Sequence, residues 1–176
     1  MNELTIGVMG TGRIGLQVLK NLSGFGCRLL AYDVYKNPEA EKIATYVDQD
    51  TIYKECDVIS LHMPLFDSTY HIINHETIAK MKDGVILINC ARGGIIDEDD
   101  LYEVLSEKKI HGAGVDVLSQ EPFDKDDRLL KLDNMIVTPH DAALNVETMN
   151  KMGLDAAQGI YEVFEGLKPS WPVSKF

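Results

Sequence analysis

Basic residues are scarce in this chain. Its 176 residues include 17 lysines and arginines against 28 aspartates and glutamates, so the formal net charge is −11 at pH 7. Nucleic acids and anionic membrane surfaces bind to basic faces, and we therefore expect neither as a partner. Any recognition of an anion must depend on a few local cations.

Cysteine is scarce too, and long apolar runs are missing. Cys27, Cys56 and Cys90 form neither a CxxC pair nor a metal-ligand spacing. We expect them to be small core residues in a reducing compartment, and we expect no metal site. No apolar run approaches the roughly 20 residues that span a bilayer, and no secretory signal opens the sequence. These absences predict a cytoplasmic protein.

The remaining composition, 45% hydrophobic and 26% charged, is typical of a globular protein, and the length suits one domain. Expected strands cover residues 4–9, 28–32, 58–61, 85–89, 112–116 and 135–138. Expected helices cover residues 14–25, 38–45, 50–55, 74–81 and 97–108. The run from Val85 to Ile88 is apolar throughout, as in a strand covered on both faces. Strands that alternate with helices predict an α/β fold with a doubly wound parallel sheet.

A glycine-rich turn follows the first expected strand. It reads GTGRIG over residues 10–15 and opens a helix. Gly10 permits a tight turn, Gly12 leaves room for phosphate, and Gly15 lets the helix pack against the strand. The N–H groups of a helix N-terminus can hold a pyrophosphate. The turn is therefore typical of the Rossmann dinucleotide-binding fold, although glycine turns without a ligand occur in many folds.

Asp33 closes the next expected strand, at the usual distance from the glycines. A carboxylate there can accept both hydroxyls of the adenosine ribose. It would repel a 2′-phosphate, so NAD is favoured over NADP. Lys36 is cationic and nearby, which leaves NADP open.

Other polar residues also follow the expected strands, where ligands of such sheets bind. Arg92 lies in NCARGGIID after one strand, and its guanidinium suits a carboxylate. The alternative for Arg92 is a salt bridge with Asp97 or Glu98 at a helix end. Glu121 and His140 follow the last two strands. A carboxylate bonded to one imidazole nitrogen leaves the other to give or take a proton, although each residue alone is more often an ordinary loop residue.

These residues together resemble the D-isomer-specific 2-hydroxyacid dehydrogenases. The matching motifs cover nearly the whole chain in the family's order. They are GTGRIG, LHMP at 61–64, NCARGGIID at 89–97, GAGVDV with EP at 121–122, and TPH at 138–140. The glutamate at position 121 and its short distance from His140 favour the branch of phosphoglycerate and glycerate dehydrogenases.

The resemblance implies hydride transfer between NADH and a 2-keto acid without a metal. Arg92 would bind and polarise the keto acid, His140 would donate the proton, and Glu121 would orient His140 and favour its charged form. The residues implied to bind the cofactor are Gly10, Gly12, Arg13, Ile14, Gly15, Asp33, Met63, Pro64, Thr69, Cys90, Ala91 and Asp116. The last six would line the path to the nicotinamide.

Members of this family have a separate substrate domain, built largely from residues ahead of the coenzyme domain. Only Met1, Asn2 and Glu3 precede the first expected strand. We therefore expect residues 1–176 to form an NAD-binding domain without a substrate domain, one that binds NAD and turns over little keto acid. Family members commonly dimerise through this domain, so the resemblance also implies a homodimer.

Two other functions stay open. One is a non-catalytic NAD-sensing module of the same family, such as a corepressor. The other is a different nucleotide-binding α/β protein, such as a methyltransferase.

The C-terminal segment also has two interpretations. Apolar residues recur at helical spacing from Val146 to Leu167. This stripe would either contact the other domain of a longer enzyme and be partly exposed here, or pack into an ordinary core.

Overall fold

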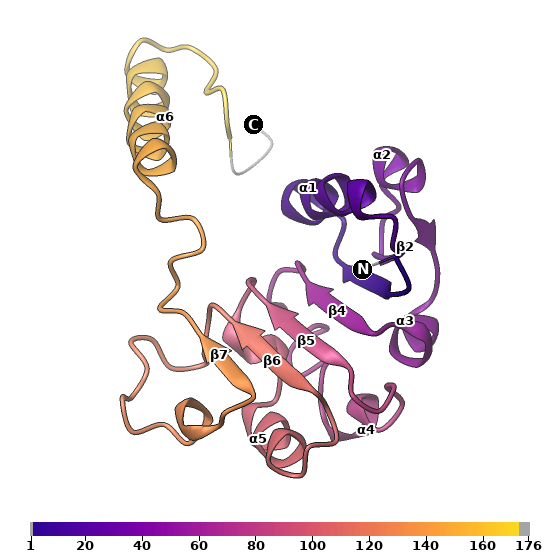
Figure 1. The fold of residues 1–176 in the computed structure, drawn as a ribbon. Coiled ribbons are helices and arrows are strands. Elements are labelled where there is room, and N and C mark those ends of the chain that lie inside the picture. The colour runs from indigo at the N-terminus through magenta and orange to yellow at the C-terminus, as the bar shows by residue number, and fades with distance from the viewer. Residues whose placement is uncertain (1, 173–176) are drawn as a thin grey trace. The chain divides into compact units, whose positions relative to one another are not determined.

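The computed structural model describes residues 2–172, and the chain divides into two compact units. Unit 1 is Met1–His140 and unit 2 is Asp141–Phe176. Unit 1 contains the sheet and most helices, and unit 2 contains one helix (Figure 1). The sequence composition shows no linker at this division.

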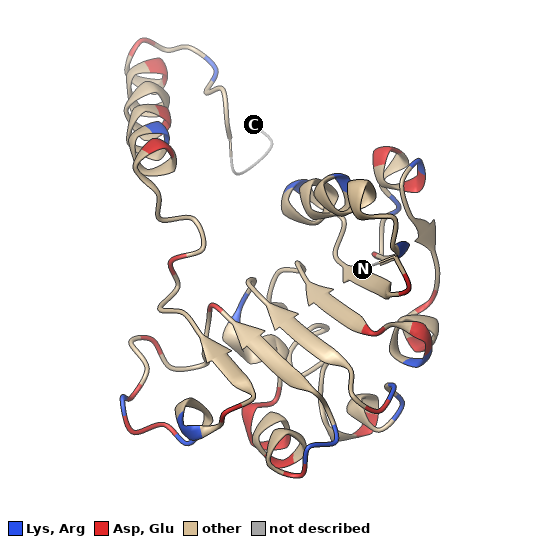
Figure 2. Cartoon of the chain, viewed as in Figure 1, with Lys and Arg blue, Asp and Glu red and all other residues tan. Residues whose placement is uncertain are grey.

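Unit 1 is built on a parallel sheet of seven strands in the order β3-β2-β1-β4-β5-β6-β7. The strands are β1 Thr5–Met9, β2 Arg28–Tyr32, β3 Thr45–Tyr46, β4 Val58–Leu61, β5 Ile86–Asn89, β6 Gly112–Val115 and β7 Met135–Val137. Helices connect successive strands, which confirms the predicted doubly wound α/β fold. Strands β4 to β7 carry no charged residue along their length (Figure 2). The edge strand β3 was not expected, because its two residues are too few to show a periodicity.

The expected helices are all present, but most are shorter than the sequence suggested. They are α1 Arg13–Leu22, α2 Pro38–Glu41, α3 Gln49–Glu55, α4 His75–Ile78 and α5 Glu98–Ser106. Three further turns are 3₁₀ helices, η1 Ser23–Phe25, η2 Gly93–Ile95 and η3 Leu129–Lys131. The side chains of Asn37, Asp48, Asn74 and Asp97 cap the helices α2 to α5 by accepting backbone N–H groups. The N-terminus of α1, at Gly12, has no such cap.

Two apolar clusters cover opposite faces of the sheet. The larger one packs α3, α4 and α5 against the strands, through residues such as Ile52, Leu87 and Leu101. The smaller one packs α1 and α2 over β1 and β2, through residues such as Val8 and Leu19. On the side that carries α1, a hollow of about 570 Å³ is lined by strand residues of β5 to β7, and Ile136 there is 71% exposed.

Unit 2 is organised around α6, Val146–Phe164, whose first turn is capped by Asn145. No residue of α6 is buried, and the stripe from Val146 to Leu167 includes many exposed apolar side chains. Within unit 2 taken by itself, the stripe is therefore exposed, and the choice between the two interpretations stays a prediction. Among the described residues, no helix combines the length and the apolar character needed to cross a membrane.

Candidate functional site

The GTGRIG turn forms a cradle between β1 and α1. Gly10 has a φ of 93°, and its N–H donates to the Tyr32 carbonyl oxygen at 2.8 Å. A Cβ on Gly15 would stand 1.9 Å from the Gly10 oxygen, whereas a Cβ on Gly12 would meet nothing within 4 Å. The helix therefore packs tightly at Gly15 and leaves open space at Gly12, in front of its uncapped N-terminus. This arrangement fits the pyrophosphate of a dinucleotide.

Arg13 and Ile14 begin α1 at the mouth of this cradle. Both side chains are exposed, and Ile14 is 66% exposed although it is apolar. They lie where the resemblance predicts contacts with the pyrophosphate.

A hollow of about 460 Å³ continues from the cradle and is bordered by Asp33. Gly10, Gly12, Met63, Pro64 and Thr69 also line it. Met63, Pro64 and Thr69 thus lie beside the expected ribose-binding acid. Which part of the cofactor these three residues contact stays a prediction.

Hydrogen bonds hold the Asp33 carboxylate in place. Its Oδ2 accepts from the Thr11 backbone N–H at 2.6 Å and from the Thr11 hydroxyl at 3.1 Å, and its Oδ1 accepts from the Tyr35 N–H at 3.1 Å. Lys36 is the nearby cation that kept NADP possible as a cofactor. Its Nζ lies 5.7 Å from the centre of the Tyr46 ring and 4.0 Å from the Glu41 carboxylate. Its charge is therefore partly compensated by an acid.

His62 lines the same hollow from the end of β4. Its Nε2 lies 2.8 Å from the Ser60 hydroxyl oxygen, while its Nδ1 is buried and has no partner among the described residues. Burial lowers the pKa of His62. Burial therefore favours the neutral form of the ring next to the glycine cradle.

Backbone hydrogen bonds join the segments at the carboxyl ends of β5, β6 and β7. The Asp116 N–H donates to the Asn89 carbonyl oxygen at 2.9 Å, and the His140 N–H donates to the Asp116 carbonyl oxygen at 2.8 Å. Asp116 is 3% exposed and accepts a hydrogen bond from the Thr138 hydroxyl. Residues that are far apart in the sequence and were expected at one edge of the sheet thus lie at the ends of three adjacent strands.

Arg92 lies in the loop that follows β5. The loop is held by the Asn89 side chain, which donates to the Arg92 carbonyl oxygen at 2.8 Å. A Cβ on Gly93 would lie 2.2 Å from the Leu118 backbone, so this loop packs directly against the loop after β6. The Arg92 side chain is exposed and donates from Nη1 to the Ala91 carbonyl oxygen at 2.6 Å.

The alternative interpretation of Arg92, a salt bridge at a helix end, is wrong for the described residues. Asp97 instead caps α5 and lies 2.9 Å from His71 Nδ1. Glu98 accepts from the Ser119 N–H at 2.6 Å. The Arg92 guanidinium therefore keeps most of its donors available for a ligand.

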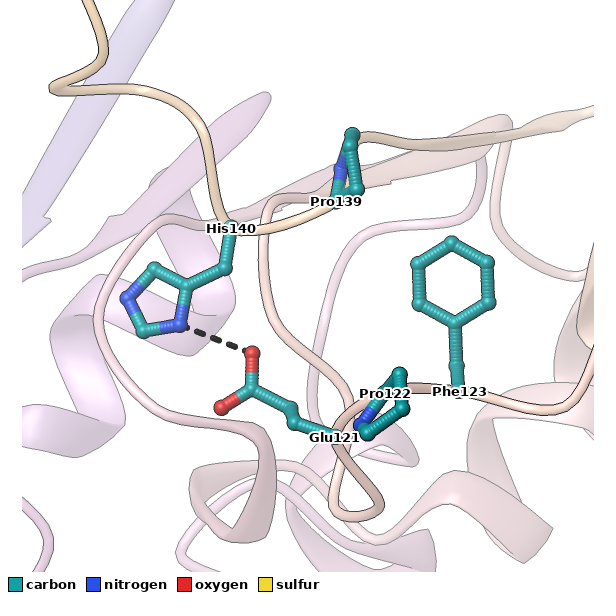
Figure 3. A pocket seen from close by; sticks show the side chains of 5 residues that line it. All are labelled: Glu121, Pro122, Phe123, Pro139 and His140. Carbon is teal, nitrogen blue, oxygen red and sulfur yellow. Dashed lines mark hydrogen bonds and ion pairs between the residues drawn. The ribbon is translucent and has the colours of Figure 1, made fainter.

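Glu121 and His140 are paired, as Figure 3 shows. His140 Nδ1 lies 2.7 Å from Glu121 Oε1, and the other ring nitrogen points away from the carboxylate (Figure 3). Both side chains are about half exposed, at 49% and 42%. They line a hollow of about 570 Å³ together with Pro122, Phe123 and Pro139. The geometry leaves His140 Nε2 free to exchange a proton with a bound molecule.

The cysteines differ from one another more than the sequence suggested. Cys56 is buried, and burial raises the pKa of its thiol to about 12. Cys27 is partly buried, and Cys90 is exposed, so the expectation of a core position is wrong for Cys90. Cys90 and the partly buried Ala91 lie between β5 and Arg92, at the edge of the sheet where the cofactor is expected.

Sequence reasoning missed the residues that hold Asp33. Thr11 occupies a variable position of the glycine motif, and Tyr46 lies on the unexpected strand β3. Nothing in the local sequence marks either as part of the site, since their role depends on a contact between β3 and the turn after β1.

Three features together are typical of the dinucleotide-binding domain of a dehydrogenase. They are the glycine cradle, Asp33 after β2, and the pair of Glu121 after β6 and His140 after β7. Residues 1–142 match the family model described as "D-isomer specific 2-hydroxyacid dehydrogenase, NAD binding domain". The chain belongs to this family, and its cofactor is NAD. This finding confirms the resemblance and removes the methyltransferase alternative.

Individual relatives support the same assignment. The hydroxypyruvate reductase of Thermotoga maritima is 48% identical over 160 residues, which cover 90% of this chain and 52% of that protein. The D-3-phosphoglycerate dehydrogenase of Methanocaldococcus jannaschii is 46% identical over 165 residues, which cover 92% of this chain and 31% of that protein. The crystal structure of D-lactate dehydrogenase with NAD⁺ from Lactobacillus jensenii superposes with a TM-score of 0.91 at 38% identity, over 99% of this chain and 56% of that one. The chain thus spans about half the length, or less, of these relatives.

Proposed function

We propose that this chain acts as the coenzyme domain of an enzyme that interconverts 2-keto acids and D-2-hydroxy acids with NAD. The observation that carries the proposal is the 2.7 Å contact between His140 Nδ1 and Glu121 Oε1, on the sheet edge that also presents Arg92. The relatives named above support it, since they are a hydroxypyruvate reductase, a D-3-phosphoglycerate dehydrogenase and a D-lactate dehydrogenase.

When bound, NADH supplies the hydride that reduces the keto carbon. The chain's own residues then have three tasks. The Arg92 guanidinium binds the keto acid and draws electron density from its carbonyl. Protonated His140 donates from Nε2 to the oxygen that becomes the hydroxyl. Glu121 fixes the ring orientation and compensates the positive charge that His140 carries before the transfer.

The cofactor-binding residues follow from the cradle and the hollow beside it. Gly10, Gly12, Arg13, Ile14 and Gly15 would hold the pyrophosphate, and Asp33 the ribose. Met63, Pro64 and Thr69 would contact the same half of the cofactor, because they line the hollow with Asp33. Cys90, Ala91 and Asp116 would lie nearer to the nicotinamide.

We further propose that this function belongs to a cytoplasmic homodimer, with residues 1–176 as the NAD-binding domain of a two-domain enzyme. The family supports the dimer, since its members commonly dimerise through this domain, and the hollow lined by Ile86, Ile88 and Ile136 is the contact face that we propose. Light scattering of the purified chain tests this, and Ile136→Lys should shift the mass toward the monomer.

A chimera tests the proposed chemistry. This chain would replace the matching half of the Thermotoga maritima hydroxypyruvate reductase, to which it is 48% identical over 160 residues. We expect the chimera to oxidise NADH with hydroxypyruvate, glyoxylate or pyruvate. The isolated chain should bind NADH and reduce these acids hardly at all.

Variants of the chimera separate catalysis from folding. His140→Asn should lower kcat by a factor on the order of 10² to 10⁴, the usual contribution of a general acid, while NADH binding is kept. His75→Asn is the matched control, because His75 is exposed and lies at the start of α4, outside the residues proposed for the site. A chimera that binds NADH but reduces none of the acids would instead favour the non-catalytic NAD-sensing module.

A further inference from the structure

A chain of hydrogen bonds reaches Asp33 from the edge of the sheet. The Asn37 N–H donates to the Tyr46 hydroxyl oxygen at 2.9 Å, the Tyr46 hydroxyl donates to Thr11 Oγ1 at 2.6 Å, and the Thr11 hydroxyl donates to Asp33 Oδ2 at 3.1 Å. We propose that Tyr46 is a positioning residue that acts through Thr11 to fix the Asp33 carboxylate, and that it thereby sets the preference for NAD over NADP.

The groups at the two ends of this series of hydrogen bonds fix the direction in which every hydroxyl in it donates. A backbone N–H can only donate, and an ionised carboxylate can only accept. The proton of Tyr46 must therefore lie toward Thr11, and the proton of Thr11 toward Asp33. Hydrogen bonds aligned in one direction polarise and strengthen one another, most of all where water is excluded. Thr11 is 1% exposed, so this part of the hydrogen-bond chain is shielded from water.

These hydrogen bonds leave one oxygen of the Asp33 carboxylate partly available to a ligand. Asp33 Oδ2 receives two hydrogen bonds from Thr11, whereas Oδ1 receives one from the Tyr35 N–H. A carboxylate oxygen can accept about two hydrogen bonds, so Oδ1 retains capacity for a ribose hydroxyl. Asp33 also borders the hollow of about 460 Å³. The carboxylate is thus held with its less occupied oxygen available to the cofactor.

Discrimination against a 2′-phosphate requires that this carboxylate cannot turn away. A mobile Asp33 could rotate and reduce its repulsion with the phosphate, at the cost of its bond to a ribose hydroxyl. Thr11 holds Oδ2 from both its backbone and its side chain, and Asn37 holds the Thr11 carbonyl oxygen at 2.9 Å. Tyr46 completes this arrangement, because without its hydroxyl the Thr11 Oγ1 loses its donor and can turn away from Asp33.

The experiment measures the dissociation constants of NADH and NADPH for the purified chain, from cofactor fluorescence. Tyr46→Phe should weaken NADH binding about fivefold, which corresponds to the loss of one hydrogen bond. The same variant should leave NADPH binding unchanged or improve it, so the ratio of the two constants moves toward NADPH. Thr11→Val should shift the ratio in the same direction, and Thr11→Ser, which keeps the hydroxyl, should preserve the wild-type ratio.

Tyr53→Phe is the matched control. It also removes a tyrosine hydroxyl, but this hydroxyl is buried on α3 and has no hydrogen-bond partner among the described residues. For Tyr53→Phe, the ratio of the dissociation constants of NADH and NADPH should equal that of the wild type. Equal weakening of NADH and NADPH by Tyr46→Phe, or no effect on either, would show a merely structural role and overturn the inference.

The inference about Tyr46 rests on the proposed role of Asp33 at the ribose. The variant Asp33→Asn tests the role of Asp33 separately from that of Tyr46. If this variant leaves the ratio unchanged, the role of Asp33 fails and the inference fails with it. If Asp33→Asn changes the ratio and Tyr46→Phe does not, only the inference about Tyr46 fails. Keto acid reduction does not enter either measurement, so a failure of the proposed chemistry remains distinguishable.

Discussion

Two glycines of the same turn should respond in opposite ways to alanine. A Cβ on Gly15 would stand 1.9 Å from the Gly10 carbonyl oxygen and 3.4 Å from the Cβ of His62. A Cβ on Gly12 would meet no atom within 4 Å. We therefore predict that Gly15→Ala damages the fold, whereas Gly12→Ala damages only the binding of NAD.

The loss of stability in each variant depends on whether the atoms around the new methyl group can shift. Gly10 cannot yield easily, because its φ of 93° excludes ordinary side-chain conformations and its N–H is bonded to Tyr32. Overpacking of this kind costs about 1 to 3 kcal/mol and at times more, so we expect Gly15→Ala to lose about 3 kcal/mol. For a domain of this size that loss lowers the Tm by roughly 6 to 12 °C. Gly12 has a φ of −65°, which alanine adopts freely, so Gly12→Ala should change stability by less than about 1 kcal/mol.

Urea denaturation and NADH fluorescence measure the two effects separately. Gly12→Ala should weaken NADH binding by at least about tenfold, since its methyl group takes the space in which the phosphates approach the backbone. An exposed glycine of the other unit, Gly153 of α6, provides the control, because a Cβ there also meets nothing within 4 Å. Normal NADH binding by Gly12→Ala, or wild-type stability of Gly15→Ala, would refute this account of the turn.

Two further predictions concern single titratable groups. Burial lowers the pKa of His62 below its ordinary value of about 6.5, so the folded protein resists protonation that the unfolded chain accepts. The stability that this difference provides is complete above about pH 6.5 and is lost as the pH falls from there through the folded-state pKa. Urea midpoints at pH 7.5 and 5.5 should therefore differ more for the wild type than for His62→Gln. Maleimide followed by mass spectrometry should label exposed Cys90 in the folded protein and leave Cys56 unlabelled, because Cys56 is buried and its pKa is raised to about 12.

The parts of this site that could be predicted are those encoded by neighbouring residues. The continuous apolar run at 85–88 indicated a central strand, and the glycines at 10–15 indicated a phosphate-binding turn. The rule that ligands bind beyond the carboxyl ends of parallel strands then brought Arg92, Glu121 and His140 to one edge. Each of these inferences needs only local sequence and the topology of the fold.

The parts that could not be predicted depend on contacts across the fold. Tyr46 lies on a strand of two residues, where neither periodicity nor propensity is measurable. Its hydroxyl reaches a threonine 35 positions earlier in the sequence. The exposure of Cys90 likewise depends on how the loop after β5 is held by Asn89, and composition alone carries no information on that.

The backbone at His140 explains why the position of this residue is well defined although its loop is exposed. His140 has a φ of 53°, a region that histidine and asparagine enter more readily than most residues. Its N–H is held by the carbonyl oxygens of Asp116 at 2.8 Å and of Thr138 at 3.0 Å. The ladder of β6 and β7 therefore continues one step beyond the strands and sets the direction of the imidazole toward Glu121. For this reason asparagine is the appropriate replacement at position 140, since it removes the acid–base group and tolerates the conformation, whereas alanine or a β-branched residue would change both at once.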